Sequence, residues 1–147
     1  MYHRILVATD GSSLSQKAVT SAIELAALTQ AELIAVKVIP NYPQSYFEGG
    51  VVLAAIDIEQ IEKQWTDEAQ LVVDNVKAQA LLQGVTTKTL AFKADLVGEA
   101  IIKAAIDNNC DLVVMASHGR RGIKRMLLGS ETQHVLTHSH IPVLILR

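Results

Sequence analysis

Small and basic residues are concentrated between positions 116 and 130, a composition typical of phosphate-binding segments. Ala116-Ser117-His118-Gly119 is followed, after nine residues, by Gly129 and Ser130. Small residues let backbone N–H groups approach an anion closely, and a helix beginning at Ser130 would add free amides and partial positive charge. The basic residues in between are Arg120, Arg121, Lys124 and Arg125. We therefore expect this segment to bind a phosphate group.

The charged side chains of this segment have two interpretations. Arg120 and its neighbours would screen phosphates, but a charged loop is usually solvated. His118 would contact a phosphate or carry a proton, yet no carboxylate is placed by the sequence to orient its ring, which favours a backbone-positioning role. Ser130 would donate to a phosphate or cap its helix, because Ser130 and Gln133 fit a capping box. These alternatives stay open.

The composition favours one α/β domain over residues 1–147. Half of the residues are apolar but only 4% are aromatic, so the core must consist of Ala, Val, Ile and Leu, as in a parallel sheet covered on both faces. The net charge of −2 gives no general reason to bind nucleic acid or an anionic membrane. Neither is expected as a partner.

The composition also bears on the location of the protein and on its redox chemistry. A strand follows Met1 almost directly, without a signal-peptide pattern, and the chain has no apolar run of about 18 residues. We expect a cytoplasmic protein. Cys110 is the single cysteine, which excludes an internal disulfide and predicts a small buried residue.

Apolar periodicity predicts alternating strands and helices. The predicted strands are residues 5–8, 33–39, 86–92, 111–117 and 141–146. The predicted helices are a first one capped by Ser13 with Gln16, then 58–82 ended by Gly84, 97–108 and 130–138. This order predicts an open five-stranded parallel sheet, order 3-2-1-4-5, with right-handed connections and helices on both faces.

The connection 41–57 interrupts this regularity. Pro40 and Pro43 lie near Tyr42, Tyr46 and Phe47, with no steady period. Its aromatic rings would stack on a base or pack on the surface. The connection itself would cover the site or bind a partner, and the sequence does not decide.

Two distant segments are expected to meet in this sheet. Ligands of open α/β sheets bind beyond the carboxyl ends of the strands, where the strand order reverses. For this order the reversal lies between the strands that end at Asp10 and at Ser117. Asp10 would contact a ribose hydroxyl or hold magnesium, or else be a turn aspartate bonded to the amide of Ser12 or Ser13. The convergence predicts a nucleotide site.

Several familiar motifs are absent. No glycine is followed at the required spacing by Gly-Lys-Ser or Gly-Lys-Thr, so a Walker A loop is not predicted, and Asp10-Gly11-Ser12-Ser13 lacks the glycines of a dinucleotide-binding turn. His134 and His138 have metal-ligand spacing, but Val135 stands where a zincin has glutamate.

Four segments carry a resemblance to a known family: Ile5-Leu6-Val7-Ala8-Thr9-Asp10-Gly11-Ser12, Asp111-Leu112-Val113-Val114-Met115-Ala116-Ser117-His118-Gly119, Leu127-Leu128-Gly129-Ser130 and Ile141-Pro142-Val143-Leu144-Ile145-Leu146. With these segments the chain as a whole resembles the ATP-binding branch of the universal stress protein family. The resemblance implies a Rossmann-like fold of the adenine nucleotide alpha-hydrolase type. The family's ATP pattern is glycine, two residues, glycine, nine residues, then glycine with Ser or Thr. Here Ala116 replaces the first glycine, and its methyl group is tolerated if φ is negative.

The resemblance also implies roles for individual residues. Ala8, Thr9 and Asp10 would border the adenine and ribose, and Val38 and Met115 would contact the base, although spacing alone makes these two apolar core. Phosphates would lie near Gly119, Gly129, Ser130 and Thr132. The remaining members of the predicted nucleotide site are Ala116, Ser117, His118, Arg120 and Glu131.

The leading hypothesis is a cytoplasmic protein in which bound ATP, with magnesium, sets conformation or partner choice in a stress response or signalling. The first alternative is an interaction protein with a degenerate, empty site. The second is slow ATP hydrolysis or phosphotransfer, although the sequence supplies no general base, nucleophile and metal cage together. The strand 141–146, from Ile141 to Leu146, is apolar on both faces, which predicts an antiparallel homodimer at that sheet edge.

Overall fold

Strands and helices alternate along the chain, in the computed structural model that describes residues 1–41, 55–118 and 128–147, with the backbone alone for 55–57. The strands are β1 (Arg4–Ala8), β2 (Glu32–Pro40), β3 (Thr87–Ala94), β4 (Leu112–Ala116) and β5 (Val143–Leu146). The helices are α1 (Ser13–Thr29), α2 (Ala55–Leu81), α3 (Val97–Asp107) and α4 (Ser130–His138). The predicted element order is confirmed, with boundaries that differ by at most three residues.

The sheet has five parallel strands in the order β3-β2-β1-β4-β5, as predicted. Val7 is the register partner of Ala35 on β2 and of Val114 on β4, which places β1 at the centre. Both neighbours of β1 run parallel to it, so the strands' carboxyl ends share one edge. The reversal of strand order therefore lies between β1 and β4.

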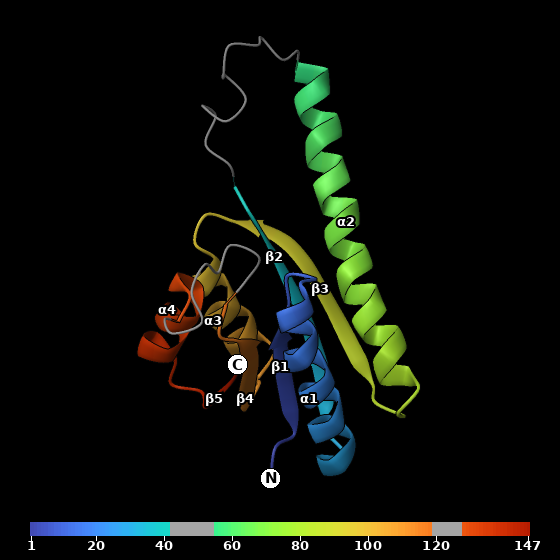
Figure 1. Cartoon of the computed structure of the whole chain (residues 1–147), viewed down its shortest axis with the longest axis vertical. Helices are drawn as coiled ribbons and strands as arrows, with labels where there is room; N and C mark the ends of the chain where they lie inside the picture. The colour runs from blue at the N-terminus through green and yellow to red at the C-terminus, as the bar shows by residue number, and fades with distance from the viewer. Residues whose placement is uncertain (42–54, 119–127) are drawn as a thin grey trace.

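Helices cover both faces of the sheet (Figure 1). On one face α1 and α2 bury a cluster that includes Ile5, Val114 and Val73; on the other α3 and α4 bury one that includes Leu6 and Val113. Adjacent residues of β1 thus enter different halves of the core, because side chains of a strand alternate between faces. Continuous apolar strands are the sequence signature of this two-sided burial.

The cap of α1 and the start of β5 differ from the predictions. Ser12, not Ser13, is the N-cap of α1 and accepts a hydrogen bond from the Ser15 amide at 3.2 Å. The Gln16 amide group does not reach back to the cap but donates to Gln79 on α2 at 2.8 Å. Strand β5 begins at Val143 because Pro142 lacks an N–H, although its carbonyl still accepts from Val113.

The predicted end of α2 is confirmed. Gly84 follows α2 with φ of +72°, a left-handed conformation that favours glycine, and its amide donates to the Leu81 carbonyl at 3.0 Å.

Among the helices described, none combines the length and the apolar character needed to cross a membrane. The predicted connection 41–57 and its rings Tyr42, Tyr46 and Phe47 lie almost wholly outside the described residues.

Cys110 is buried at the start of β4, as predicted, with 7% of its surface exposed. Burial, reinforced by the carboxylate of Asp111, raises the pKa of its thiol to about 11. Thiolate is the reactive form, so folded protein should resist alkylation by iodoacetamide at pH 8. We expect full labelling in denaturant and labelling at least about 100-fold slower in buffer, followed by mass spectrometry. Equal rates would contradict the buried, protonated thiol.

Candidate functional site

The carboxyl ends of β1 and β4 lie side by side. Val7 is paired with Val114, so Ala8 comes next to Met115 and the residues after it come next to Ala116 and Ser117. The Thr9 amide still donates to Val36 on β2, at 3.0 Å, before the chain turns into α1. The predicted meeting of Asp10 with the end of β4 is therefore consistent with the observed strand order and register.

Hydroxyl groups fix the turn between β1 and α1. The buried Thr9 Oγ1 lies 3.0 Å from Ser15 Oγ and accepts the Gly11 amide at 3.2 Å. Ser15 Oγ also lies 2.9 Å from the Ser12 carbonyl oxygen, to which it donates. Asp10 Oδ1 accepts the Ser12 amide at 2.9 Å, which confirms the turn interpretation of this aspartate. The Thr9 hydroxyl thus points into the protein, and the backbone of the turn borders the sheet edge.

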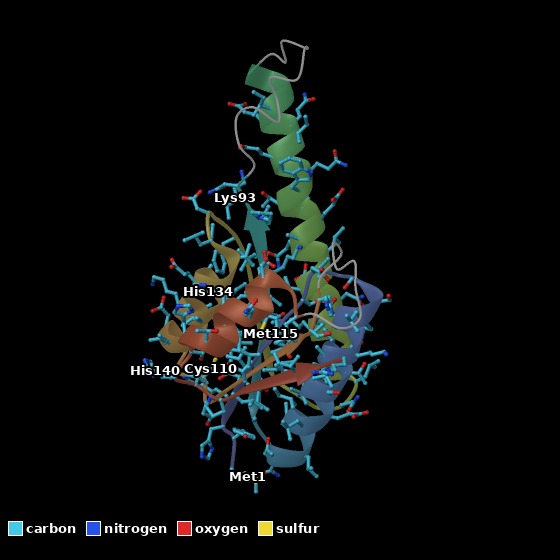
Figure 2. The ribbon with its side chains drawn as sticks, turned by 60° about the vertical axis from the view of Figure 1, so that its left-hand side comes forward. Met1, Lys93, Cys110, Met115, His134 and His140 are labelled. Carbon is cyan, nitrogen blue, oxygen red and sulfur yellow. The ribbon has the colours of Figure 1, made fainter. Side chains whose placement is uncertain are left out.

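The residues predicted to contact a base lie on one face of the sheet. Ala8, Val38 and Met115 belong to, or pack against, the core under α3 and α4. Val38 and Met115 are 6% and 5% exposed, so both are largely core side chains, as their spacing alone indicated. Figure 2 shows Met115 in the interior behind α4. Contact of either residue with a base stays a prediction.

Ala116, which replaces the first glycine of the family pattern, has an ordinary strand conformation. Among the described residues, positive φ outside glycine occurs at Gln30 and Asn109, so φ of Ala116 is negative. Its side chain packs in the core under α1, on the face opposite Met115. The methyl group therefore costs no backbone strain, and it points away from the face that carries the predicted base contacts.

Two hydrogen bonds join the end of β4 to the start of α4. The Gly129 amide donates to the Ser117 carbonyl at 2.8 Å, and the buried Thr132 Oγ1 donates to the Ala116 carbonyl at 2.9 Å. Ser117 is in turn tied to β5, because its amide donates to the Leu146 carbonyl at 2.8 Å. The Thr132 hydroxyl proton is engaged inside the protein, so Thr132 positions this junction; its contact with a phosphate stays a prediction.

Close packing at this junction favours glycine at position 129. A Cβ atom there would lie 3.3 Å from the Ser117 carbonyl oxygen and 3.6 Å from His118 Cα. Gly129 is also the N-cap of α4, so the prediction that Ser130 caps this helix is wrong. The Ser130 hydroxyl donates instead to Glu131 Oε2 at 2.9 Å. No side chain of the described residues caps α4, which leaves its first amides for another acceptor.

His118 brings a polar atom to the same junction. Its Nδ1 lies 2.9 Å from Ser117 Oγ, which fixes the orientation of the ring. Its Nε2 is buried and has no hydrogen-bond partner among the described residues. An unpaired buried polar atom is costly, and such atoms in native proteins commonly mark a place for a ligand or water.

Part of the predicted site lies outside the described residues. Gly119, Arg120, Arg121, Lys124 and Arg125 fall in segment 119–127. A cavity of about 630 Å³ lies elsewhere, between β3 and α3, and its lining includes Phe92 and Leu96 together with acidic and basic side chains: Asp95, Glu99, Asp107, Lys93 and Lys103. None of the predicted nucleotide residues lines that cavity.

Sequence reasoning missed Ser12 and Ser15 as contributors to the sheet edge. Ser12 caps α1 and Ser15 anchors Thr9, so together they direct the amino end of α1 toward the end of β1. The signal was present, since two serines three residues apart fit an N-cap with its N3 partner. Ser13 and Gln16, one residue further along, fit the more complete capping-box pattern, which predicts the cap at Ser13.

The arrangement as a whole defines a class of protein: a parallel α/β domain with a phosphate-compatible helix terminus at its switch point. The chain belongs to the universal stress protein family, whose model matches residues 1–147. It is 34% identical over 149 aligned positions to universal stress protein YxiE of Bacillus subtilis, with full coverage of both chains. Its fold matches that of protein MJ0577 of Methanocaldococcus jannaschii, with a TM-score of 0.82, 29% identity and coverage of 99% and 96%.

Two further universal stress proteins of the same fold have been solved with nucleotides. One is a complex with cAMP, with a TM-score of 0.68, 24% identity and coverage of 99% and 97%. The other is a protein of Archaeoglobus fulgidus in complex with dAMP, with a TM-score of 0.66, 17% identity and coverage of 99% and 98%. At these identities the likeness to the present chain is one of fold.

Proposed function

We propose that this protein is a cytoplasmic nucleotide-responsive stress or signalling protein that binds ATP, with magnesium, at the junction of β1, β4 and α4. The observation that carries the proposal is the start of α4, which no side chain of the described residues caps, next to His118, whose buried Nε2 has no hydrogen-bond partner among those residues. Helix amides and an imidazole N–H are both suitable donors to phosphate oxygens. The cAMP and dAMP complexes support an adenine nucleotide as the ligand of this fold.

The remaining contacts follow from the geometry of the sheet edge. Ala8, Val38 and Met115 would supply an apolar side for the base, and the Asp10 carboxylate would lie near the ribose or the metal. The phosphates would then extend over Gly129 toward the amides of Ser130 and Glu131. The negative φ of Ala116 supports a site that admits a nucleotide over the alternative of a degenerate, empty site.

A homodimer through β5 is the second part of the proposal. β5 is an edge strand, paired with β4 alone, and its Leu144 is 40% exposed. A paired edge would cover these apolar side chains and satisfy the free backbone groups. The dimer would present two nucleotide sites, one for each chain.

Nucleotide binding can be tested on freshly purified protein. We expect denaturation to release an adenine nucleotide that mass spectrometry identifies, and calorimetry on nucleotide-free protein to detect ATP with magnesium at a Kd below about 1 mM, equivalent to about −4 kcal/mol. Release of ATP itself would favour a sensor, whereas ADP or AMP would point to turnover. Absence of heat at millimolar ATP in the stripped protein would refute the proposal.

A further inference from the structure

The first turn of α4 carries its own negative charge at the proposed phosphate position. Glu131 is exposed and its Oε2 accepts the Ser130 hydroxyl at 2.9 Å. An acidic residue in the first turn of a helix stabilises that helix, because it complements the partial positive charge of the amides. An arriving phosphate therefore meets amides whose potential is already reduced, and a hydroxyl whose proton is already donated.

This arrangement affects ligands in proportion to their charge. A like charge about 6 Å from an exposed carboxylate lowers affinity roughly threefold at a water-like dielectric constant. ATP has two more phosphoryl groups than AMP, each adding about one negative charge. The factor by which Glu131 lowers affinity would thus be roughly tenfold larger for ATP than for AMP, unless a divalent cation neutralises the additional phosphates.

We propose that Glu131 is a specificity-determining residue, which makes the site favour adenosine monophosphates over metal-free ATP and makes ATP binding depend on magnesium. The inference rests on the proposed function, because it concerns the same site. Glu131 lies in the first turn of α4, where the proposed site places the phosphates, so its charge would act mainly on the phosphate chain. The protein would then respond to magnesium-bound ATP and to monophosphates as distinct ligands.

The test is the ratio of ATP to AMP affinity, measured by calorimetry on the nucleotide-free full chain in EDTA. We expect Glu131→Gln, which removes the charge and keeps an acceptor for Ser130, to raise that ratio roughly tenfold, mostly through ATP. With magnesium the same substitution should change the ratio less than about twofold, because the cation neutralises the extra phosphates. In 1 M NaCl the effect should shrink, since the Debye length falls to about 3 Å.

Glu24→Gln is the matched control, because Glu24 is an exposed glutamate of α1 three turns from the sheet edge and its replacement changes the net charge equally. It should leave the ratio at the wild-type value. Glu131→Ala separates the two effects further, since it also frees the Ser130 hydroxyl. We expect it to bind ATP at least as tightly as Glu131→Gln.

The outcomes distinguish the inference from the function on which it rests. If both nucleotides bind but the ratio in EDTA is the same for wild type and Glu131→Gln, the inference is overturned and nucleotide binding stands. If neither protein binds ATP or AMP, both fall. Circular dichroism verifies folding; should the variant not fold, a wild-type ratio that is independent of salt and magnesium overturns the inference equally.

Discussion

Replacing Gly129 with valine should abolish nucleotide binding while the sheet remains folded. The first added carbon already lies 3.3 Å from the Ser117 carbonyl oxygen, and the two further methyl carbons of valine must displace backbone around His118. This displacement moves the start of α4 away from β4 and also fills the space over which a phosphate would lie. We expect at least a 100-fold loss of affinity and a stability loss of about 1–3 kcal/mol, typical of overpacking.

Calorimetry with ATP and magnesium, together with urea unfolding, measures both effects. Gly84→Ala is the control, because Gly84 lies far along the chain at the end of α2 and its φ of +72° makes alanine costly by about 1 kcal/mol. That variant should lose stability and keep its affinity. Wild-type affinity in Gly129→Val would show that phosphates do not approach this junction. Retained partner binding with lost nucleotide would favour the interaction-protein alternative.

Ile145→Pro should convert the proposed dimer to a monomer. The carbonyls of Pro142 and Leu146 accept from β4, so the alternate residues Val143 and Ile145 direct their backbone groups to the open edge. Proline at position 145 removes an outward N–H without breaking the bonds to β4. An antiparallel partner strand would lose a hydrogen bond and meet the proline ring at the centre of the interface.

Light scattering at micromolar concentration should give about 32 kDa for the wild type, twice the chain mass of 15.9 kDa, and the chain mass for Ile145→Pro. Ile145→Ala is the matched control, because it loses the same packing against the α3 side of the core but keeps the N–H. It should remain dimeric. A monomeric wild type would refute the dimer, and a dimeric proline variant would place the interface elsewhere.

The sheet was predictable because each strand is a short apolar run bounded by turn residues. Strand order followed from the alternation of strands and helices, and the expectation that Asp10 meets Ser117 followed from strand order, with which the observed register is consistent. The same logic located the start of α4 at Ser130. These features depend on patterns that extend over many residues, so an error of one residue in a boundary does not change them.

The predictions that failed depend on single atoms. Ser12 and Ser13 are both able to cap a helix, and the choice was decided by the contact of Ser15 with Thr9 in three dimensions. Ser130 fits a capping box, but Gly129 is the N-cap residue, because its close approach to Ser117 sets where the helix begins. The buried Nε2 of His118, which has no partner in the described part of the chain, has no sequence signal, since burial of one ring nitrogen depends on the surrounding chain.

The bond between Gly129 and Ser117 has a consequence for the length of the connection that it closes. It brings two points 12 residues apart to 2.8 Å. The entropy of closing a loop grows slowly with its length, by about 0.6 kcal/mol for each doubling. The closure entropy of this junction would therefore change little if the connection were a few residues longer or shorter, so the junction itself places little constraint on that length.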